Sequence, residues 1–75
     1  MKKWLDIIGW CGAALLLAAF AANSFGYLGR SDAAYQFMNL FGAVGIALQA
    51  YTRRAFPAAA LNVVWAIIAV IALLL

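Results

Sequence analysis

Three apolar stretches, separated by two short polar breaks, constrain the fold of this chain more than any other feature. They cover residues 4–25, 33–52 and 57–75, and each is close to the roughly 20 residues that an α-helix needs to cross a bilayer. Hydrophobic residues make up 71% of the 75 residues and charged residues 9%, against roughly 45–50% and 25% in soluble domains. A soluble domain this short cannot bury that much apolar surface. We therefore expect an all-α integral membrane protein, a single unit whose three transmembrane helices form a compact antiparallel bundle.

Both breaks carry turn and capping residues. The first, residues 26–32, contains two glycines and ends in Ser31 and Asp32, either of which would serve as the N-cap of the second helix. The second break, residues 53–56, precedes Pro57, which is favoured at the first position of a helix.

The basic residues predict the orientation. Lysines occupy residues 2–3 and arginines occupy residues 53–54, whereas Arg30 in the other break is offset by Asp32. Basic residues are retained on the cytoplasmic side. We therefore expect a multi-pass protein of the bacterial inner membrane, with a cytoplasmic N-terminus, a periplasmic 26–32 loop and a periplasmic C-terminus.

The first apolar stretch has a second interpretation. A basic start, an apolar run and the small residues Ala19 and Ala21 also resemble a cleavable secretory signal. The length of the run and the flanking Trp4 and Trp10 favour a retained helix. Whether residues 1–21 are ever removed stays open from the sequence.

Small residues predict the faces through which the helices pack. Membrane helices associate through small residues and interhelical hydrogen bonds, because lipid is as apolar as leucine. We expect Ala14 and Ala18 to form the packing face of the first helix, and Gly42 and Gly45 that of the second. In the third helix the expected stripe consists of Ala58, Asn62, Trp65, Ala69 and Ala72.

Polar side chains within the apolar stretches are the only candidates for a binding site. The candidate stripe consists of Tyr35, Asn39, Gln49, Asn62 and Trp65. At about 1.5 Å of rise per residue, Asn23 lies level with Gln36, and Gln49 lies level with Asn62, with Asn39 between the two layers. These groups could fix the register of the helices, line a small polar pocket, or form an interface with another chain.

No catalytic set can be assembled from these residues. The chain has no histidine and a single cysteine, Cys11, and it offers no nucleophile–base pair, metal cluster or phosphate-binding loop. We expect no enzymatic activity, no metal and no cofactor, and the scattered basic residues exclude a nucleic-acid interface. Asp6 is expected to be a charge at the membrane interface near the helix N-terminus, and Cys11 and Met38 to be packing residues.

Three short motifs carry a family resemblance. They are Gly9-Trp10-x-Gly12, Tyr35-x-x-x-Asn39-x-x-Gly42 and Pro57-x-x-x-x-Asn62-x-x-Trp65. With these motifs the chain resembles the CBU-type family of small bacterial inner-membrane proteins over nearly its whole length. The resemblance implies a membrane-embedded helical fold and marks the motif residues as positions of interest, but it implies no activity.

Two functions of different class follow as expectations. The first is a structural or accessory membrane protein, embedded in lipid and assembled with other copies of itself or with a larger membrane complex. The second is a minimal transporter or channel formed by several copies, with the layers of Asn39 and Asn62 facing a shared axis.

Overall fold

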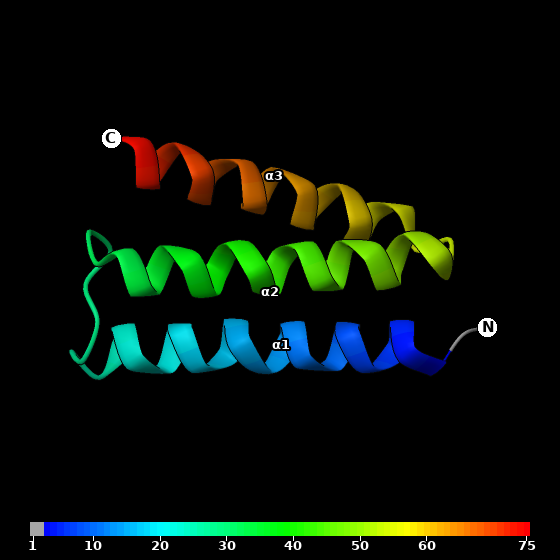
Figure 1. The fold of residues 1–75 in the computed structure, drawn as a ribbon, viewed down its shortest axis with the longest axis horizontal. Coiled ribbons are helices and arrows are strands. Elements are labelled where there is room, and N and C mark those ends of the chain that lie inside the picture. Colours follow the sequence, from blue (N-terminus) through cyan, green and yellow to red (C-terminus); the bar gives the residue numbers. More distant parts are fainter. Residues whose placement is uncertain (1–2) are drawn as a thin grey trace.

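The fold consists of three α-helices joined by short connections. The computed structural model describes residues 3–75, which form α1 (Lys3–Ser24), α2 (Ala33–Thr52) and α3 (Phe56–Leu74), with no strand in this described part. Successive helices run antiparallel (Figure 1). The bounds lie within one residue of those expected from the apolar stretches. Lys2, one of the basic residues used to predict the orientation, lies outside the described residues.

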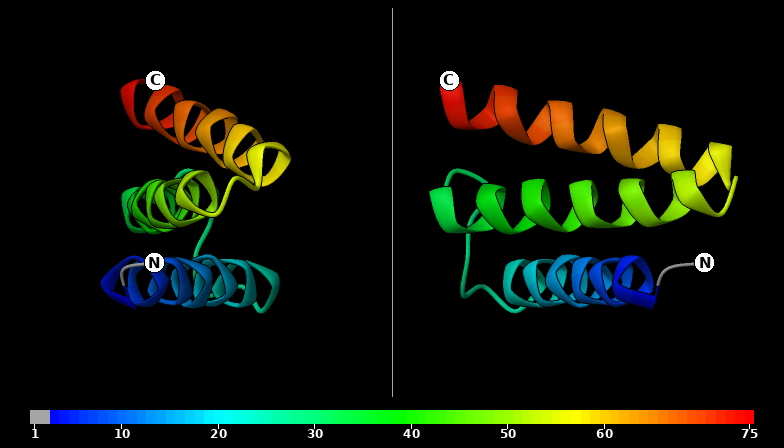
Figure 2. Two further views of the ribbon diagram at one scale, coloured as in Figure 1. Left: turned by 90° about the vertical axis from the view of Figure 1, so that its right-hand side faces the viewer. Right: turned by 45° about the vertical axis from the view of Figure 1, so that its right-hand side comes forward.

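The helices lie in a row with α2 in the middle. α1 and α3 both pack against α2, and within the described residues they do not pack against each other. The end-on view shows the three helices stacked one after another rather than closed into a triangle (Figure 2). The expected compact bundle is therefore an open arrangement, in which only α2 is covered on two sides.

The closest approach between α1 and α2 is made by two glycines. A Cβ atom at Gly12 would lie 2.5 Å from the carbonyl oxygen of Gly42, and one at Gly42 would lie 2.8 Å from the carbonyl oxygen of Gly12. A Cβ atom at Gly45 would lie 3.0 Å from the carbonyl oxygen of Ile8. Gly42 and Gly45, which the sequence predicts as packing residues, are both buried against α1.

The predicted packing face of α1 is wrong. Ala14 and Ala18 are exposed, whereas the buried residues of α1 are Gly9, Gly12 and Ala19. Ala14 lies two positions after Gly12, a step of about 200° around a helix, so the two faces point in nearly opposite directions. The glycine face packs inward because residues without a Cβ allow the backbones to approach more closely than alanine does.

The α3 stripe is correct in part. Ala69 is buried and Asn62 is half-buried, but Ala58 and Ala72 are exposed, and Ala59 is buried instead. Small residues are frequent enough in α3 that several stripes of similar composition exist.

Both α1 and α2 end in a left-handed residue that closes the last turn. Gly26 has φ 85°, and the N–H of Tyr27 donates to the carbonyl oxygen of Ala22 at 2.8 Å. Arg54 has φ 59°, and the N–H of Ala55 donates to the carbonyl oxygen of Ala50 at 2.8 Å. Glycine is the usual residue at this position, so Arg54 adopts a conformation that costs a residue with a Cβ about 1 kcal/mol.

The N-cap position of α2 is occupied by Asp32, one of the two residues predicted for it. Its side chain does not cap the helix. Instead, the carboxylate accepts a hydrogen bond from the N–H of Gly29 at 2.6 Å and so closes the preceding loop on itself.

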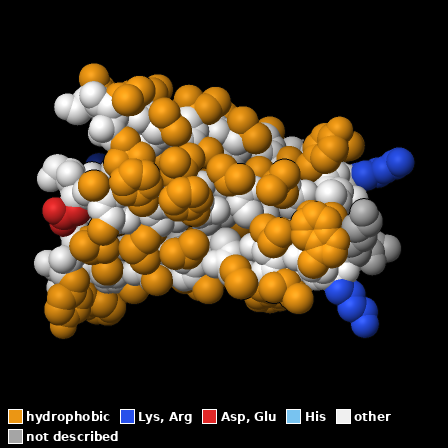
Figure 3. Space-filling model, viewed as in Figure 1, with side chains coloured by type: hydrophobic (Ala, Val, Ile, Leu, Met, Phe, Trp, Pro, Cys, Tyr) orange, Lys and Arg blue, Asp and Glu red, His pale blue; other side chains and the backbone are white. Residues whose placement is uncertain are grey.

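Two of the three helices, α1 and α3, are long and apolar enough to cross a membrane. α2 does not meet the same criterion, because Gln36, Asn39 and Gln49 lie within it. The space-filling view shows hydrophobic side chains along the length of the molecule, and lysine or arginine side chains that project from its right-hand end (Figure 3).

Candidate functional site

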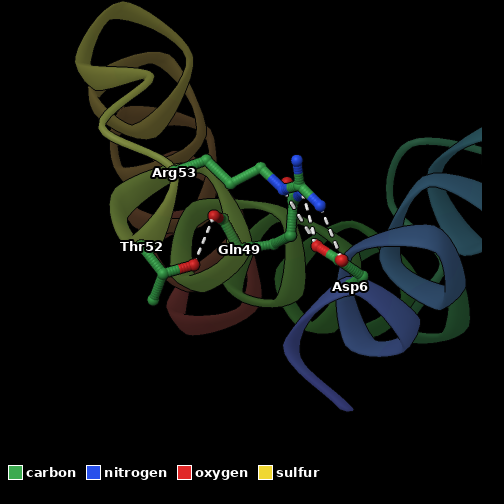
Figure 4. A network of polar contacts seen from close by, with 4 residues as sticks. All are labelled: Asp6, Gln49, Thr52 and Arg53. Atoms are coloured by element: carbon green, nitrogen blue, oxygen red, sulfur yellow. Dashed lines mark hydrogen bonds and ion pairs between the residues drawn. The ribbon is translucent and has the colours of Figure 1, made fainter. Parts of the chain in front are cut away.

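A charged cluster ties the beginning of α1 to the end of α2 (Figure 4). The guanidinium of Arg53 donates from Nη2 to Asp6 Oδ2 at 2.6 Å and from Nε to Asp6 Oδ1 at 3.0 Å. Gln49 donates from Nε2 to the same Oδ1 at 3.3 Å. The side chains of Arg53 and Asp6 remain 49% and 28% exposed, so solvent screens the pair and its main effect is to fix geometry.

Gly9 makes room for this cluster. A Cβ atom at Gly9 would lie 2.6 Å from Cγ of Gln49, so the side chain of Gln49 lies directly against the α1 backbone on its way to Asp6. One turn further on, Thr52 donates from Oγ1 to the carbonyl oxygen of Gln49 at 2.7 Å. The hydrogen bond to Asp6 raises the pKa of the Arg53 guanidinium above its ordinary value.

Sequence reasoning missed this cluster. The sequence predicts Asp6 only as an interfacial charge near the two N-terminal lysines, and it places Gln49 level with Asn62. The signal was present, because antiparallel neighbours of similar length place the start of α1 level with the end of α2. A carboxylate one turn into α1 and an arginine just after α2 are therefore natural partners.

A second polar tie joins α2 to α3. Trp65 donates from Nε1 to Asn39 Oδ1 at 3.3 Å, and Asn39 donates from Nδ2 to the carbonyl oxygen of Tyr35 at 3.1 Å. The Asn39 side chain is only 6% exposed and is the one buried polar residue among those described. The structure thus brings together Tyr35, Asn39 and Trp65, three of the five residues of the predicted stripe.

Asn62 and the predicted polar pairs behave differently. Asn62 donates to the carbonyl oxygen of Ala58 in its own helix at 2.9 Å and does not contact Gln49, which bonds Asp6 instead. Asn23 and Gln36 do not bond each other either, because each donates to a carbonyl of the 26–32 loop. Asn23 donates to Leu28 at 2.9 Å, and Gln36 donates to Arg30 at 2.7 Å. Carbonyl oxygens close by in the sequence compete successfully with distant amides.

An open cleft lies beside the Asn39–Trp65 hydrogen bond, at the end of α2 next to the 26–32 loop. Its volume is about 280 Å³, and its lining includes Arg30, Tyr35, Gln36, Asn39, Trp65 and Ile68. A second cleft of about 230 Å³ shares Tyr35, Asn39 and Trp65 as walls and is completed by Leu16, Leu17 and Phe20 of α1. Asn62, predicted for a polar pocket here, lines neither cleft.

The described residues offer little reactive chemistry. Residues 3–75 contain no group of three or more histidine, cysteine, aspartate or glutamate side chains that could hold a metal ion. Each buried side-chain nitrogen or oxygen in the same range has a hydrogen-bond partner, and Cys11 is exposed. The arrangement can hold helices together and can accommodate a ligand in the cleft. Among the described residues, the lining of that cleft contains no serine, cysteine, histidine, aspartate or glutamate.

Comparison with known proteins places the chain in a family. Searches among curated proteins and among solved structures give no match. A family model matches residues 5–75, a range that contains all three motifs in which the sequence resembles the CBU-type family. The chain therefore belongs to the CBU-type family.

Proposed function

We propose that this chain is a small integral membrane protein with a structural or accessory role, which crosses the membrane three times and assembles with other copies or with a larger membrane complex. Its placement in the membrane is supported by the exposure of its apolar helices. Only 17% of the most apolar window of α1 and 11% of that of α3 are buried within the chain. The core helix of a soluble protein would instead be mostly buried.

The central helix supports the same placement despite its lower hydropathy. Its large exposed side chains are all apolar or aromatic, namely Phe37, Phe41, Val44, Leu48 and Tyr51. Its amides Gln36, Asn39 and Gln49 all bond within the chain. A helix that keeps its polar groups for its neighbours and presents apolar groups outward suits a lipid environment.

The proposed orientation places the N-terminus and the 53–54 turn in the cytoplasm, and the 26–32 loop and the C-terminus in the periplasm. Lys3 and Arg54 lie at one end of the helix row, and Arg30 lies at the other with Asp32 nearby in sequence. This distribution agrees with the retention of basic residues on the cytoplasmic side.

The observation that supports the accessory role is that the polar groups bond within the chain, whereas the outer faces of α1 and α3 are left uncovered. Asp6, Asn39 and Gln49 are all bonded within the chain, so these polar groups serve to hold the helices together. α1 and α3 each have a single helix neighbour, so their outer faces are open to lipid or to another protein. An accessory subunit needs such faces and no reactive group.

Cysteine labelling tests the proposed topology. In a Cys11→Ala background, Ser31→Cys should react with a membrane-impermeant maleimide from outside the cytoplasmic membrane, and Thr52→Cys should react only after permeabilisation. If both positions label from the same side, the three-crossing topology is wrong.

Crosslinking and native mass spectrometry test the proposed assembly. On α1, Ala18 is exposed and Ala19 is fully buried against the chain's own helices, which makes them a matched pair. In the same Cys11→Ala background, Ala18→Cys should form disulfide-linked or partner-linked products in the membrane, and Ala19→Cys should not. A strictly monomeric particle in mild detergent, without a co-purifying protein, would contradict the accessory role.

A minimal oligomeric transporter or channel is the second candidate, favoured by the polar cleft beside Asn39 and Trp65. Purified protein in liposomes should then catalyse solute flux that falls on substitution Asn39→Leu. The absence of flux from the intact protein would remove this candidate.

A further inference from the structure

We infer that the paired clefts bind one anionic phospholipid, with the net negative headgroup at Arg30 and an acyl chain against Leu17 and Phe20. This inference rests on the membrane placement proposed above. It concerns the end of the molecule that carries the 26–32 loop, away from the cluster of Asp6 and Arg53.

The mouth of the larger cleft has a cation with no anion of its own. Arg30 forms no ion pair among the described residues, since the single salt bridge there joins Arg53 to Asp6. The nearest acidic residue in the sequence, Asp32, uses its carboxylate to accept from the N–H of Gly29. Arginine binds phosphate oxygens through several donors held in a plane.

The backbone of Arg30 is held at the cleft by a second residue of its lining. Gln36 donates from Nε2 to the carbonyl oxygen of Arg30 at 2.7 Å, and both residues line the cleft together with Tyr35. The backbone that carries this cation is therefore attached to α2 by a side-chain hydrogen bond, at the end of the helix where a headgroup would lie.

The smaller cleft provides the apolar half of the site. Leu16, Leu17 and Phe20 of α1 face the same Tyr35, Asn39 and Trp65 that border the larger cleft. The amide of Asn39 already accepts a hydrogen bond from Trp65 and donates one to the carbonyl oxygen of Tyr35. An acyl chain in the smaller cleft would therefore not break either of these hydrogen bonds. One cleft has a cation in its lining, the other has apolar walls from α1, and the two share Tyr35, Asn39 and Trp65, an arrangement that matches an amphiphile.

A third groove, about 400 Å³ in volume, is lined by Val44, Leu48, Ala59 and Val63 among others, all of them hydrophobic apart from the Tyr51 hydroxyl. It has no cation at either end of its lining, so it provides nothing that would select a headgroup. The site at Arg30 differs because both parts of a phospholipid find a counterpart there.

Quenching of tryptophan fluorescence by brominated lipids tests the inference. Trp65 borders both clefts, so a Trp4→Phe, Trp10→Phe parent reports on this site alone, after circular dichroism has shown that it stays helical. The parent is reconstituted in phosphatidylcholine vesicles that contain brominated phosphatidylglycerol or brominated phosphatidylcholine. We expect an apparent preference of about fivefold for phosphatidylglycerol, the size expected for one basic side chain at an anionic lipid surface.

Substitutions separate the site from general attraction to the surface. Arg30→Gln should abolish the preference, Arg30→Lys should retain most of it, and Arg54→Gln at the opposite end should leave it unchanged. Leu17→Trp, measured by mass spectrometry of co-purified lipid, should reduce retention by filling the apolar branch.

Three outcomes would overturn the inference. The first is equal quenching by both lipids in the parent. The second is a loss of preference in Arg54→Gln that equals the loss in Arg30→Gln. The third is competition by inorganic phosphate but not by chloride at the same ionic strength, which would indicate a site for free phosphate. Protein that remains in the aqueous phase without detergent would instead contradict the proposed membrane placement.

Discussion

Substitution Gly12→Ala tests the glycine contact on which the α1–α2 interface depends. The added methyl group would lie 2.5 Å from the carbonyl oxygen of Gly42 and 3.1 Å from the backbone nitrogen of Ile46. The first distance is shorter than Cβ atoms in proteins tolerate, and the second is tighter than most contacts that Cβ atoms make. Because both neighbours are backbone atoms, no rotation of a side chain can relieve the overlap, and the two helices have to move apart.

The net cost follows from two opposing terms. Overpacking of a well-packed contact costs about 1–3 kcal/mol, and replacing glycine by alanine within a helix recovers up to about 1 kcal/mol. We expect Gly12→Ala to lower the free energy of unfolding by about 1–2 kcal/mol. Gly9→Ala should also be destabilising, because its methyl group would lie 2.6 Å from Cγ and 2.7 Å from Cβ of Gln49. Rotation of the Gln49 side chain moves Cγ but not Cβ, so the helices have to shift here as well, and the hydrogen bond from Gln49 to Asp6 is disturbed.

The assay is reversible unfolding by sodium dodecyl sulfate, followed by fluorescence energy transfer between labels on α1 and α2. Ala14→Val and Ala18→Val provide the matched controls, since these residues lie on the exposed face of the same helix. They should unfold at the midpoint of the parent under monomeric conditions. The reasoning is refuted if Gly12→Ala is as stable as the parent, or if the valine controls lose as much stability as Gly12→Ala does.

Three further predictions concern the polar ties and the second turn. Asn39→Leu and Trp65→Phe should each weaken the packing of α3 against α2. A double-mutant cycle between them should give a coupling energy of about 0.6 kcal/mol, with an upper limit near 1.7. A coupling energy of zero would show that the 3.3 Å hydrogen bond contributes nothing to stability. Asp6→Asn should lower the unfolding midpoint, and the charge swap Asp6→Arg with Arg53→Asp should recover it; no recovery would mean that the ion pair does not hold α1 against α2. Arg54→Gly should raise stability by up to about 1 kcal/mol, because glycine is not strained at φ 59°. It should also increase the fraction of chains with inverted topology in a reporter assay; a lower unfolding midpoint would contradict the conformational argument.

The positions of the helices could be predicted because the signals for them are local. Apolar runs of the right length fixed the bodies of the helices, and the glycines of the 26–32 loop and Pro57 fixed their ends. Gly42 and Gly45 could be assigned to a packing face as well, since they are glycines three residues apart on one side of α2. The neighbouring stripe of Ala43, Ala47 and Ala50 does not compete with them, because α2 packs on two sides and Ala43 and Ala50 are buried too.

The side of α1 that packs against α2 could not be predicted in the same way. α1 carries two stripes of small residues on nearly opposite sides, one through Gly9 and Gly12 and one through Ala14 and Ala18. Periodicity identifies both and does not rank them. The choice depends on which stripe matches the close approach of Gly42, and that information lies in the partner helix.

The candidate site was likewise predictable only in part. Asn39 and Trp65 were expected to belong to one polar group, and their hydrogen bond joins α2 to α3. The partner of Gln49 was missed because height along the membrane does not distinguish the two neighbours of a central helix. Asn62 on α3 and Asp6 on α1 both lie near its level, and the gap left by Gly9 gives access to Asp6.

The lower hydropathy of α2 and its central place in the row have a common cause. A helix at the edge of the row needs only one face that packs against a neighbouring helix. The other faces of α1 and α3 can therefore be apolar, and both helices are apolar enough to cross a membrane. α2 has to bind two helices, and it does so with an amide directed to each side, Gln49 toward Asp6 of α1 and Asn39 toward Trp65 of α3. Replacing these amides by leucine would make α2 resemble a membrane span more closely in composition, while removing its bond to Trp65 and one of the three hydrogen bonds on Asp6. The polarity that separates α2 from its neighbours in the sequence therefore contributes to both of its helix contacts, together with the glycines that pack against α1.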